Sequence, residues 1–341
     1  SIIKIGHNIK YDISILKKYD LEVKSYEDTM LMSYSCDAGV NRHGMDELAR
    51  IHLNRETIKF KDVVGSGKSQ LTFDQVDLKR ATEYAAEDAE ITYKLYKFFK
   101  KRVQQENNSL VYSTIEKPLV NCLMRMEING IKVDVNYLQK LSNDFSKRIL
   151  SLEKEIYKKT KVEFNIGSSD QLSDVLFKKL KLSPPKKTKT GKNSTGIAVL
   201  EDLAYKGNVV AEDIIKWRQL SKLKNTYTDA LQNHIVNKTK RIHTSYAMAS
   251  TSTGRLASSD PNLQNIPIRT DEGRSIRTAF IAEKGNVILS ADYSQIELRV
   301  LAHMADVPQL KEAFNNNEDI HQITASEIFN IKLKDVTQDL R

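Results

Sequence analysis

The chain has 341 residues, with 53 Lys and Arg against 44 Asp and Glu, which gives a formal charge of +9. Compact domains usually hold about 100 to 200 residues, so we expect two or three domains. The only cysteines, Cys36 and Cys122, form no CxxC pair, which argues against a disulfide framework or a structural zinc site. No apolar run approaches the roughly 18 residues that span a bilayer. We therefore expect a protein with no membrane partner, in a reducing compartment.

The positive charge is concentrated in one stretch of the chain. Residues 129–195 hold 15 Lys and Arg against 7 Asp and Glu, which accounts for +8 of the +9. Such a local basic surface is typical of a protein that binds nucleic acid. The chain also begins without Met and ends at VTQDLR, so we expect it to be an internal piece of a longer protein.

Residues 1–107 have the pattern of an α/β domain. An apolar start is followed by a segment with Ile9, Ile13 and Leu16 at helical spacing, and further helices are predicted over 45–53 and 79–103. The polar stretch after the last of these helices lacks apolar periodicity. We therefore place a domain boundary near residue 107.

Long helices are predicted for most of residues 108–245, for example over 135–160. Residues 246–341 begin with a polar, irregular run. The apolar run 287–289 then predicts a short buried strand that ends near Asp292, with a helix after it. A carboxylate at a strand end is costly to desolvate without a cation or several donors, so we expect Asp292 to meet a positive group.

Two pairs of polar residues in the first domain are each four positions apart. Asn8 precedes Asp12 in GHNIKYDISIL, and Tyr84 precedes Asp88 in ATEYAAEDAEIT, so each pair lies on one face of a helix. Solvated side chains on amphipathic helices are the alternative interpretation. Together and in this order, the two pairs resemble the second and third signature motifs of the proofreading 3′ to 5′ exonucleases, which have a ribonuclease H-like fold.

This resemblance implies phosphodiester hydrolysis with two Mg²⁺ ions. Asp12 and Asp88 would be metal ligands, Tyr84 would orient the attacking water, and Asn8 would support the site. Phe73 matches an aromatic position that contacts the frayed 3′ end in this family, with a place in the core as the alternative. The first motif of the family, an Asp-x-Glu pair, does not occur before Asn8 in this chain.

The stretch ADYSQIELRVLAHMA, residues 291–305, resembles motif A of the family A DNA polymerases. Residues 244–282 and 318–331 continue the resemblance, which runs over the whole chain. It implies a multidomain fold of the α/β and α+β classes. The implied parts are a partial ribonuclease H-like exonuclease domain at 1–107, the polymerase N-terminal part and a mostly helical thumb at 108–245, and the first part of the palm at 246–341, cut before the fingers.

The same resemblance assigns roles around Asp292. This residue would bind both Mg²⁺ ions of phosphoryl transfer, with the Tyr293 carbonyl as an additional ligand. Glu297 would crowd the 2′ position of the incoming sugar, and His321 would contact the incoming triphosphate. The alternatives are a turn residue for Asp292, a capping box of Ser294 with Glu297, and a surface position for His321.

Polar donors gather on the irregular run before motif A. Amide and guanidinium donors suit the minor groove, where all base pairs present acceptors in nearly equivalent places. The resemblance implies primer-template contacts for Arg255, Asn262, Gln264, Asn265 and Arg269.

The thumb is expected to supply contacts to the duplex backbone. Lys222 and Arg218 match thumb positions near that backbone. Seven lysines from Lys178 to Lys192, with no acid among them, are expected to lie at the thumb tip against duplex phosphates. Such contacts would add affinity that depends on salt and not on sequence.

These features predict a template-directed DNA polymerase of the replication and repair type, with a proofreading 3′ to 5′ exonuclease domain. Expected partners are primed duplex DNA, single-stranded 3′ ends and dNTPs, with two Mg²⁺ ions for each complete active site. We expect a monomer in the bacterial cytoplasm, or in an organelle of bacterial descent. A non-catalytic nucleic-acid-binding protein and a stand-alone 3′ to 5′ exonuclease are the alternatives. We expect this chain alone to be inactive, because it holds only some carboxylates of each site.

Overall fold

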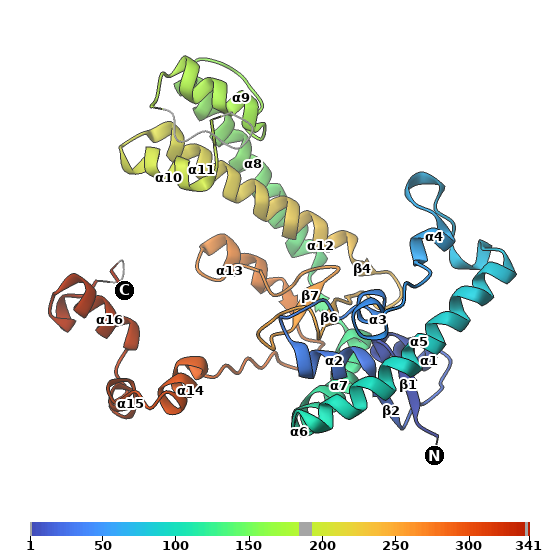
Figure 1. Cartoon of the computed structure of the whole chain (residues 1–341). Helices are drawn as coiled ribbons and strands as arrows, with labels where there is room; N and C mark the ends of the chain where they lie inside the picture. Colours follow the sequence, from blue (N-terminus) through green and yellow to red (C-terminus); the bar gives the residue numbers. More distant parts are fainter. Residues whose placement is uncertain (1, 184–192, 338–339) are drawn as a thin grey trace. The chain divides into compact units, whose positions relative to one another are not determined.

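A computed structural model describes residues 2–183, 193–337 and 340–341 (Figure 1). The chain divides into two compact units, Ser1–Gly285 and Asn286–Arg341. No helix among the described residues has the length and apolar character needed to cross a membrane.

The first part of the larger unit is built around one long helix. Two short strands pair in parallel, and the helices α2 and α3 pack against α5. In chain order the elements are β1 (Lys4–Gly6), α1 (Ile9–Lys17), β2 (Tyr26–Asp28), α2 (Thr29–Asp37), α3 (Met45–Leu53), α4 (Phe60–Val64) and α5 (Leu78–Gln105). The sequence predictions of helices over 45–53 and 79–103 are confirmed.

A connecting segment follows and shares its core with the first part. It consists of α6 (Ser109–Val111), the π-helical turn η3 (Tyr112–Glu116) and α7 (Lys117–Asn129). Leu95 of α5 packs in one cluster with Leu123 of α7 and Met248 near the end of the unit. The apolar core therefore continues from the first part of the chain into residues far along it.

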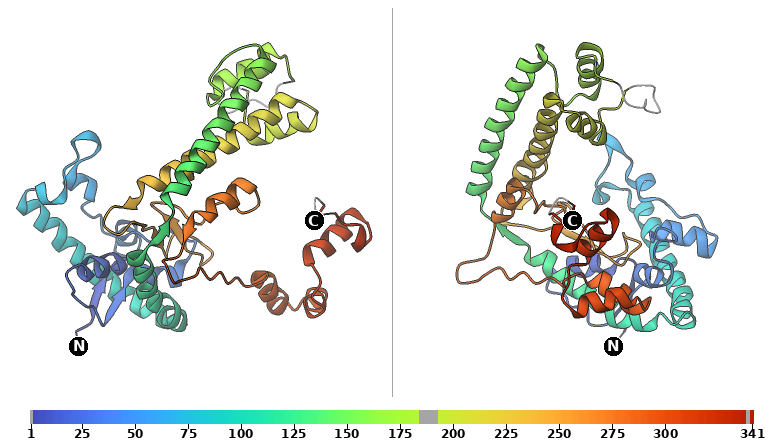
Figure 2. Two further views of the ribbon diagram at one scale, coloured as in Figure 1. Left: turned by 180° about the vertical axis from the view of Figure 1, so that it is seen from behind. Right: turned by 90° about the vertical axis from the view of Figure 1, so that its left-hand side faces the viewer.

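Two long helices pack against each other in the larger unit. α8 (Val135–Thr160) and α11 (Val209–Leu223) run side by side (Figures 1 and 2). The observed bounds of α8 confirm the predicted helix over 135–160. Shorter elements cover the far end or continue α11: α9 (Ser169–Ser173), η4 (Asp174–Lys179), α10 (Ile197–Tyr205), η5 (Lys224–Asp229) and α12 (Ala230–Asn233).

Short strands and one helix close the larger unit. An antiparallel sheet has the order β4-β5-β3-β8, and β6 pairs with β7 in a separate hairpin. These elements are β3 (Ile131–Val133), β4 (Ile235–Val236), β5 (Arg241–Ile242), β6 (Ser245–Ala247), β7 (Ala257–Ser259), α13 (Asp271–Thr278) and β8 (Phe280–Ile281). The hairpin leads into the loop that was predicted to contact DNA.

The smaller unit is helical, with α14 (Ile296–Met304), α15 (Pro308–Asn315), α16 (Ile320–Phe329) and the short η6 (Leu333–Asp335). The predicted buried strand at 287–289 is wrong. Val287, Ile288 and Leu289 are 88%, 57% and 88% exposed and belong to no strand. A strand needs a neighbour to which it can hydrogen-bond. Within the described residues, no strand pairs with residues 287–289.

Candidate active sites and nucleic-acid interface

The start of α1 is held by a buried carboxylate. Asn8 is the N-cap residue and adopts a left-handed conformation with φ of 59°. The Asp28 carboxylate accepts hydrogen bonds from the backbone amides of Asn8 (3.1 Å) and Ile9 (2.9 Å). It also accepts from two amides at the start of α2. Asp28 therefore satisfies the open N-terminal amides of both helices and fixes the turn that precedes Asp12.

The two carboxylates linked to α1 have altered acidities. Burial raises the pKa of Asp28 to about 6, although four backbone N–H donors act in the opposite direction. Asp12 lies on the exposed side of α1, and partial desolvation raises the pKa of its carboxyl above the usual range. Asp12 is therefore available to a ligand, whereas Asp28 is occupied within the fold.

Tyr84 and Asp88 meet on α5, as the spacing of four predicts. The Tyr84 hydroxyl donates a hydrogen bond to the Asp88 carboxylate. Burial, this bond and the charge of Asp88 raise the pKa of Tyr84 to about 12. Burial also raises the pKa of Asp88, while the hydrogen bond from Tyr84 opposes that rise. The nearby charge of Asp46 on α3 raises both values further.

Two further aromatic rings lie beside Tyr84. Phe73 lies 6.0 Å from Tyr84 between ring centroids, and Phe60 lies 5.9 Å from Tyr84 and 6.1 Å from Phe73. Phe60 and Phe73 are 47% and 41% exposed, so the alternative of a core position for Phe73 is wrong. Sequence reasoning missed Phe60. Its place between two lysines in IKFKDVV, where a core residue is unfavourable, was the available signal.

The described residues contain no group of three or more His, Cys, Asp or Glu side chains arranged to hold a metal ion. Asp12 on α1 is exposed and Asp88 on α5 is half-buried. Both carboxylates are oxygen donors of the kind that Mg²⁺ prefers, and both can be reached from solvent. The donor chemistry therefore fits a hard divalent cation.

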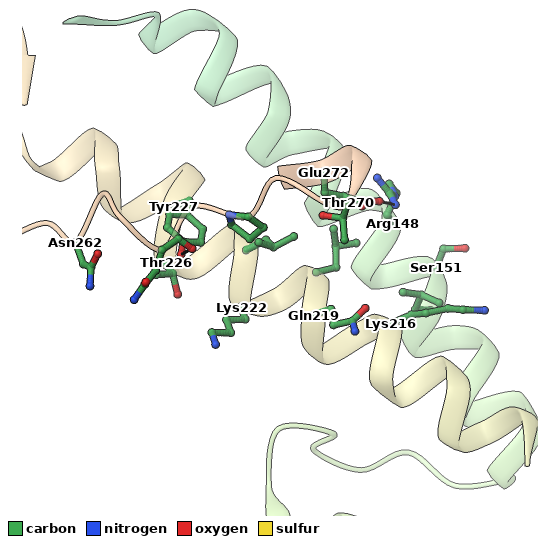
Figure 3. Close-up of a pocket in the computed structure, with 15 residues that line it drawn as sticks. Arg148, Ser151, Lys216, Gln219, Lys222, Thr226, Tyr227, Asn262, Thr270 and Glu272 are labelled. Atoms are coloured by element: carbon green, nitrogen blue, oxygen red, sulfur yellow. Dashed lines mark hydrogen bonds and ion pairs between the residues drawn. The ribbon is translucent and has the colours of Figure 1, made fainter. Parts of the chain in front are cut away.

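A groove of about 1040 Å³ opens along α8 and α11 (Figure 3). Three residues predicted to contact DNA line it: Lys222, Asn262 and Asn265. Further polar lining residues were not predicted: Arg148, Ser151, Lys216, Gln219, Thr226, Thr270 and Glu272. Their helical spacing, for example Lys216 with Gln219 and Arg148 with Ser151, is the signal that could have found them.

The charges in this groove are not all available to a ligand. Arg148 forms an ion pair with Glu272, and this contact lowers the pKa of the Glu272 carboxyl. Lys216 and Lys222 have no acidic partner within the described ranges and are therefore the free cations of the groove.

The loop between β7 and α13 presents some of its predicted residues and uses another internally. The Gln264 side chain accepts from the Ser258 amide (3.0 Å) and donates to the Leu256 carbonyl (3.0 Å). Gln264 therefore shapes the loop. Arg269 of this loop is exposed, and so is Arg255, which lies between β6 and β7.

Arg218, predicted near the duplex backbone, has a different environment. It is partly buried and donates to the backbone carbonyl of Thr195 at 2.5 Å. Burial lowers the pKa of its guanidinium. Of the predicted lysine-rich tip, Lys186, Lys187, Lys189 and Lys192 lie outside the described residues.

The smaller unit has its own pocket of about 450 Å³. Tyr293, Glu297 and His321, three residues predicted to contact the metal or the incoming nucleotide, line it together with Gln295. Asp292, next to Tyr293, is exposed. The pocket therefore gathers residues from the start of α14 and of α16.

The start of α14 excludes one alternative for Glu297. The helix begins at Ile296 with Gln295 as its N-cap, so Ser294 and Glu297 do not occupy the positions of a capping box. Arg299 donates to the Ser294 carbonyl at 3.0 Å and lies over the Phe314 ring, 4.4 Å from its centroid. Arg299 is therefore engaged in structural contacts.

Two protein families match the chain in sequence. DNA polymerase family A matches residues 135–341, and a 3′-5′ exonuclease family matches residues 1–104. The chain belongs to DNA polymerase family A. This agrees with the resemblance of its motif A and of its exonuclease motifs.

Curated relatives and a solved structure are similar over the whole chain. A DNA polymerase I of Rhizobium leguminosarum is 52% identical over 341 residues, covering 100% of this chain and 34% of the relative. A DNA polymerase I of Pseudomonas aeruginosa is 46% identical over 344 residues, covering 99% and 38%. The chain thus spans about a third of these relatives. The POL domain of Pol1 from M. smegmatis, solved with DNA primer-template and dNTP, matches with a TM-score of 0.82 and 31% identity, covering 99% of this chain and 56% of that one.

Proposed function

We propose that this chain is part of a template-directed DNA polymerase of the replication and repair type, with a proofreading 3′ to 5′ exonuclease. The observation that carries the proposal is the pocket that brings Tyr293, Glu297 and His321 together beside the exposed Asp292. His321 lies more than twenty positions from the other three in the sequence, yet the fold joins them. The M. smegmatis structure, similar in fold, contains a primer-template and dNTP, the substrates that this function requires.

In the polymerase site, the Asp292 carboxylate and the Tyr293 carbonyl would hold Mg²⁺. The metal ions supply charge neutralisation at the triphosphate and at the primer 3′ oxygen. Glu297 lies on the first turn of α14 and would crowd the 2′ position of the incoming sugar. His321, on the first turn of α16, binds the triphosphate.

In the exonuclease site, Asp12 and Asp88 would hold Mg²⁺, which supplies activation of water and stabilisation of the leaving oxygen. Tyr84 keeps its proton at neutral pH, since its pKa is about 12, and with this proton donated to Asp88 in a hydrogen bond its hydroxyl oxygen can orient the attacking water as an acceptor. Asn8 supports the turn before Asp12. The exposed rings of Phe60 and Phe73 can stack on the unpaired base of a frayed 3′ end.

The groove along α8 and α11 is the proposed path of the primer-template duplex. Lys216 and Lys222 attract phosphates, and Asn262 and Asn265 offer amide donors from the facing loop. Arg255, Gln264 and Arg269 belong to the same contact surface or shape its loop. A groove with free cations on one side and amides on the other suits a polyanion that is recognised without regard to sequence.

We further assign residues 1–107 to the exonuclease domain, 108–245 to the polymerase N-terminal part and thumb, and 246–341 to the first part of the palm. We propose that the complete protein is a monomer of the bacterial cytoplasm. Its partners are primed duplex DNA, single-stranded 3′ ends and dNTPs.

The test uses the full-length protein with one substitution in each site. Asp292→Ala should abolish primer extension and preserve 3′ excision, whereas Asp88→Ala should abolish excision and preserve extension. Both activities are measured on an end-labelled primer-template with Mg²⁺. A wild-type protein that binds the DNA but neither extends nor trims the primer would favour a non-catalytic binding protein and contradict the proposal.

A further inference from the structure

A buried ion pair joins the first helix to the connecting segment. Lys10, on the first turn of α1, is only 7% exposed and pairs with the Glu127 carboxylate near the end of α7. The Glu127 side chain is largely buried as well. Because charges lose hydration when they are buried, leaving either of these two charges without its partner is costly.

Glu127 also forms hydrogen bonds with residues that follow the connecting segment. The oxygen that receives Lys10 accepts a hydrogen bond from the Tyr246 amide on β6, at 2.7 Å. The backbone carbonyl of Glu127 accepts from the His243 side chain, at 2.7 Å. Glu127 is therefore fixed against the hairpin strand β6, and Lys10 is attached to that fixed point.

The pair acts on the same turn of α1 as Asp28 does. Asp28 holds the backbone amides of Asn8 and Ile9, while Glu127 holds the side chain of the next residue, Lys10. Two independent contacts thus fix the turn that carries Asn8 and leads to Asp12. Glu127 lies in residues 105–134, between the exonuclease match and the polymerase match.

We propose that Glu127 is a positioning residue for the 3′ to 5′ exonuclease reaction, acting through Lys10 on the turn of α1 that carries Asn8 and Asp12. This inference rests on the proposed exonuclease function. It implies that the orientation of Asp12 depends on a residue more than a hundred positions away, outside the matched exonuclease region.

The test is made in the full-length protein with Glu127→Gln. Glutamine keeps an oxygen for the Tyr246 amide but removes the charge that pairs with Lys10. The substitution should therefore weaken the contact with α1 and keep the contact with β6. Lys10→Met removes the cation of the pair, and the double variant removes both charges. Asp213→Asn is the control, because it breaks an ion pair far from the exonuclease motifs, between the buried Asp213 of α11 and the exposed Lys159 of α8.

For Glu127→Gln we expect kcat for excision from a single-stranded oligonucleotide to fall about tenfold, as is typical when a residue that orients a metal ligand is removed. KM should stay close to wild type, because the substitution leaves the DNA contacts in place. Primer extension should be unchanged. Lys10→Met should give a similar decrease, and the double variant should be no slower than either single variant, since both substitutions break one interaction.

The unfolding midpoint of each variant is measured in parallel, and excision is assayed where all variants are folded. Asp213→Asn should lower the midpoint without lowering excision. Wild-type kcat in Glu127→Gln, with Asp88→Ala inactive, would overturn the positioning role and leave the exonuclease function intact. Additive decreases in the double variant, or an equal decrease of excision in Asp213→Asn, would also overturn it. Absence of excision in the wild type would overturn the exonuclease function itself, and the inference with it.

Discussion

The Tyr84 hydroxyl donates a hydrogen bond to the Asp88 carboxylate, one helical turn further along α5. The phenol is held protonated, with its pKa raised to about 12, so the donor is present throughout the neutral range. Phe60 and Phe73 pack beside the same phenol. One turn of α5 therefore places a carboxylate and a hydroxyl donor beside the rings of Phe60 and Phe73.

Tyr84→Phe in the full-length protein is expected to slow 3′ excision by roughly 10- to 100-fold, the cost of removing one hydrogen bond to a charged group. The ring and its contacts with Phe60 and Phe73 remain, so DNA affinity should change little. Single-turnover excision of a labelled single strand measures the effect. Tyr93→Phe, at an exposed position on the same helix, is the control and should keep the wild-type rate. An unchanged rate in Tyr84→Phe would remove Tyr84 from the catalytic residues.

Phe60→Ala and Phe73→Ala are each expected to weaken binding of single-stranded 3′ ends. Stacking of a base on an aromatic ring contributes about 1 to 3 kcal/mol, so KM for excision should rise about tenfold in either variant. Excision kinetics at varied DNA concentration give the value. Tyr205→Ala, an exposed aromatic on α10, should leave KM unchanged. If KM stays at the wild-type value in both Phe variants, the ring cluster stabilises the fold and does not bind the DNA end.

Lys216→Ala and Lys222→Ala should weaken binding of duplex DNA to a similar degree for every sequence. Removing one lysine–phosphate interaction should flatten the slope of log affinity against log salt by about 0.9. A fluorescence titration of a primer-template at several salt concentrations measures this slope. Lys140→Ala, an exposed lysine of α8 outside the groove, is the control. A slope that changes as much in Lys140→Ala as in the groove variants would show that the groove has no special role.

Asp292→Ala should abolish primer extension in the full-length protein while the fold and DNA binding are kept. The side chain is exposed and packs in no core, so its removal should cost little stability. Removal of a central metal ligand should raise the barrier by several kcal/mol, so we expect less than about a tenth of the wild-type rate. Primer extension, circular dichroism and DNA titration are compared on one preparation. A variant with more activity than this would contradict the metal-ligand role.

The helices were predictable because their apolar periodicity is long and regular. The helix from Val135 to Thr160 has the predicted bounds. The run at 287–289 was not predictable in the same way, because three apolar residues do not determine whether a neighbouring strand exists to pair with them. Periodicity reports the face that a residue occupies, whereas strand formation depends on partners elsewhere in the chain.

The candidate sites were predictable as residue types but not as contacts. Tyr293, Glu297 and His321 do meet in one pocket. Arg218 and Gln264 are donors of the expected kind, yet each donates within the fold, Arg218 to the Thr195 carbonyl and Gln264 to the Leu256 carbonyl. A sequence shows that a side chain can donate. It does not show whether that side chain is already hydrogen-bonded to a carbonyl of the same chain.

Burial raises the pKa of the Asp28 carboxyl to about 6 from the ordinary value of 3.8. Below about pH 4 the carboxyl is protonated in both the folded and the unfolded chain. Between about pH 4 and 6 the unfolded chain loses this proton and the folded chain keeps it. The folded state then binds more protons, so the contribution of Asp28 to stability falls as pH rises, by at most about 1.4 kcal/mol per pH unit.

Asp28→Asn removes this titration. The variant should be less stable in acid, because an amide offers one oxygen to the four backbone amides where the carboxyl group offers two. The unfolding free energy of the wild type minus that of the variant should therefore decrease from pH 4 to 6 and level off above pH 6. Urea unfolding at half-unit pH steps measures it. Glu90→Gln is the control of opposite sign, because Lys94 and Arg55 lower the pKa of Glu90. The unfolding free energy of the wild type minus that of Glu90→Gln should therefore increase as pH rises through the acid range. A difference for Asp28→Asn that is flat or rising over the same interval would show that the buried carboxyl is ionised at no cost, with its four N–H donors offsetting its burial.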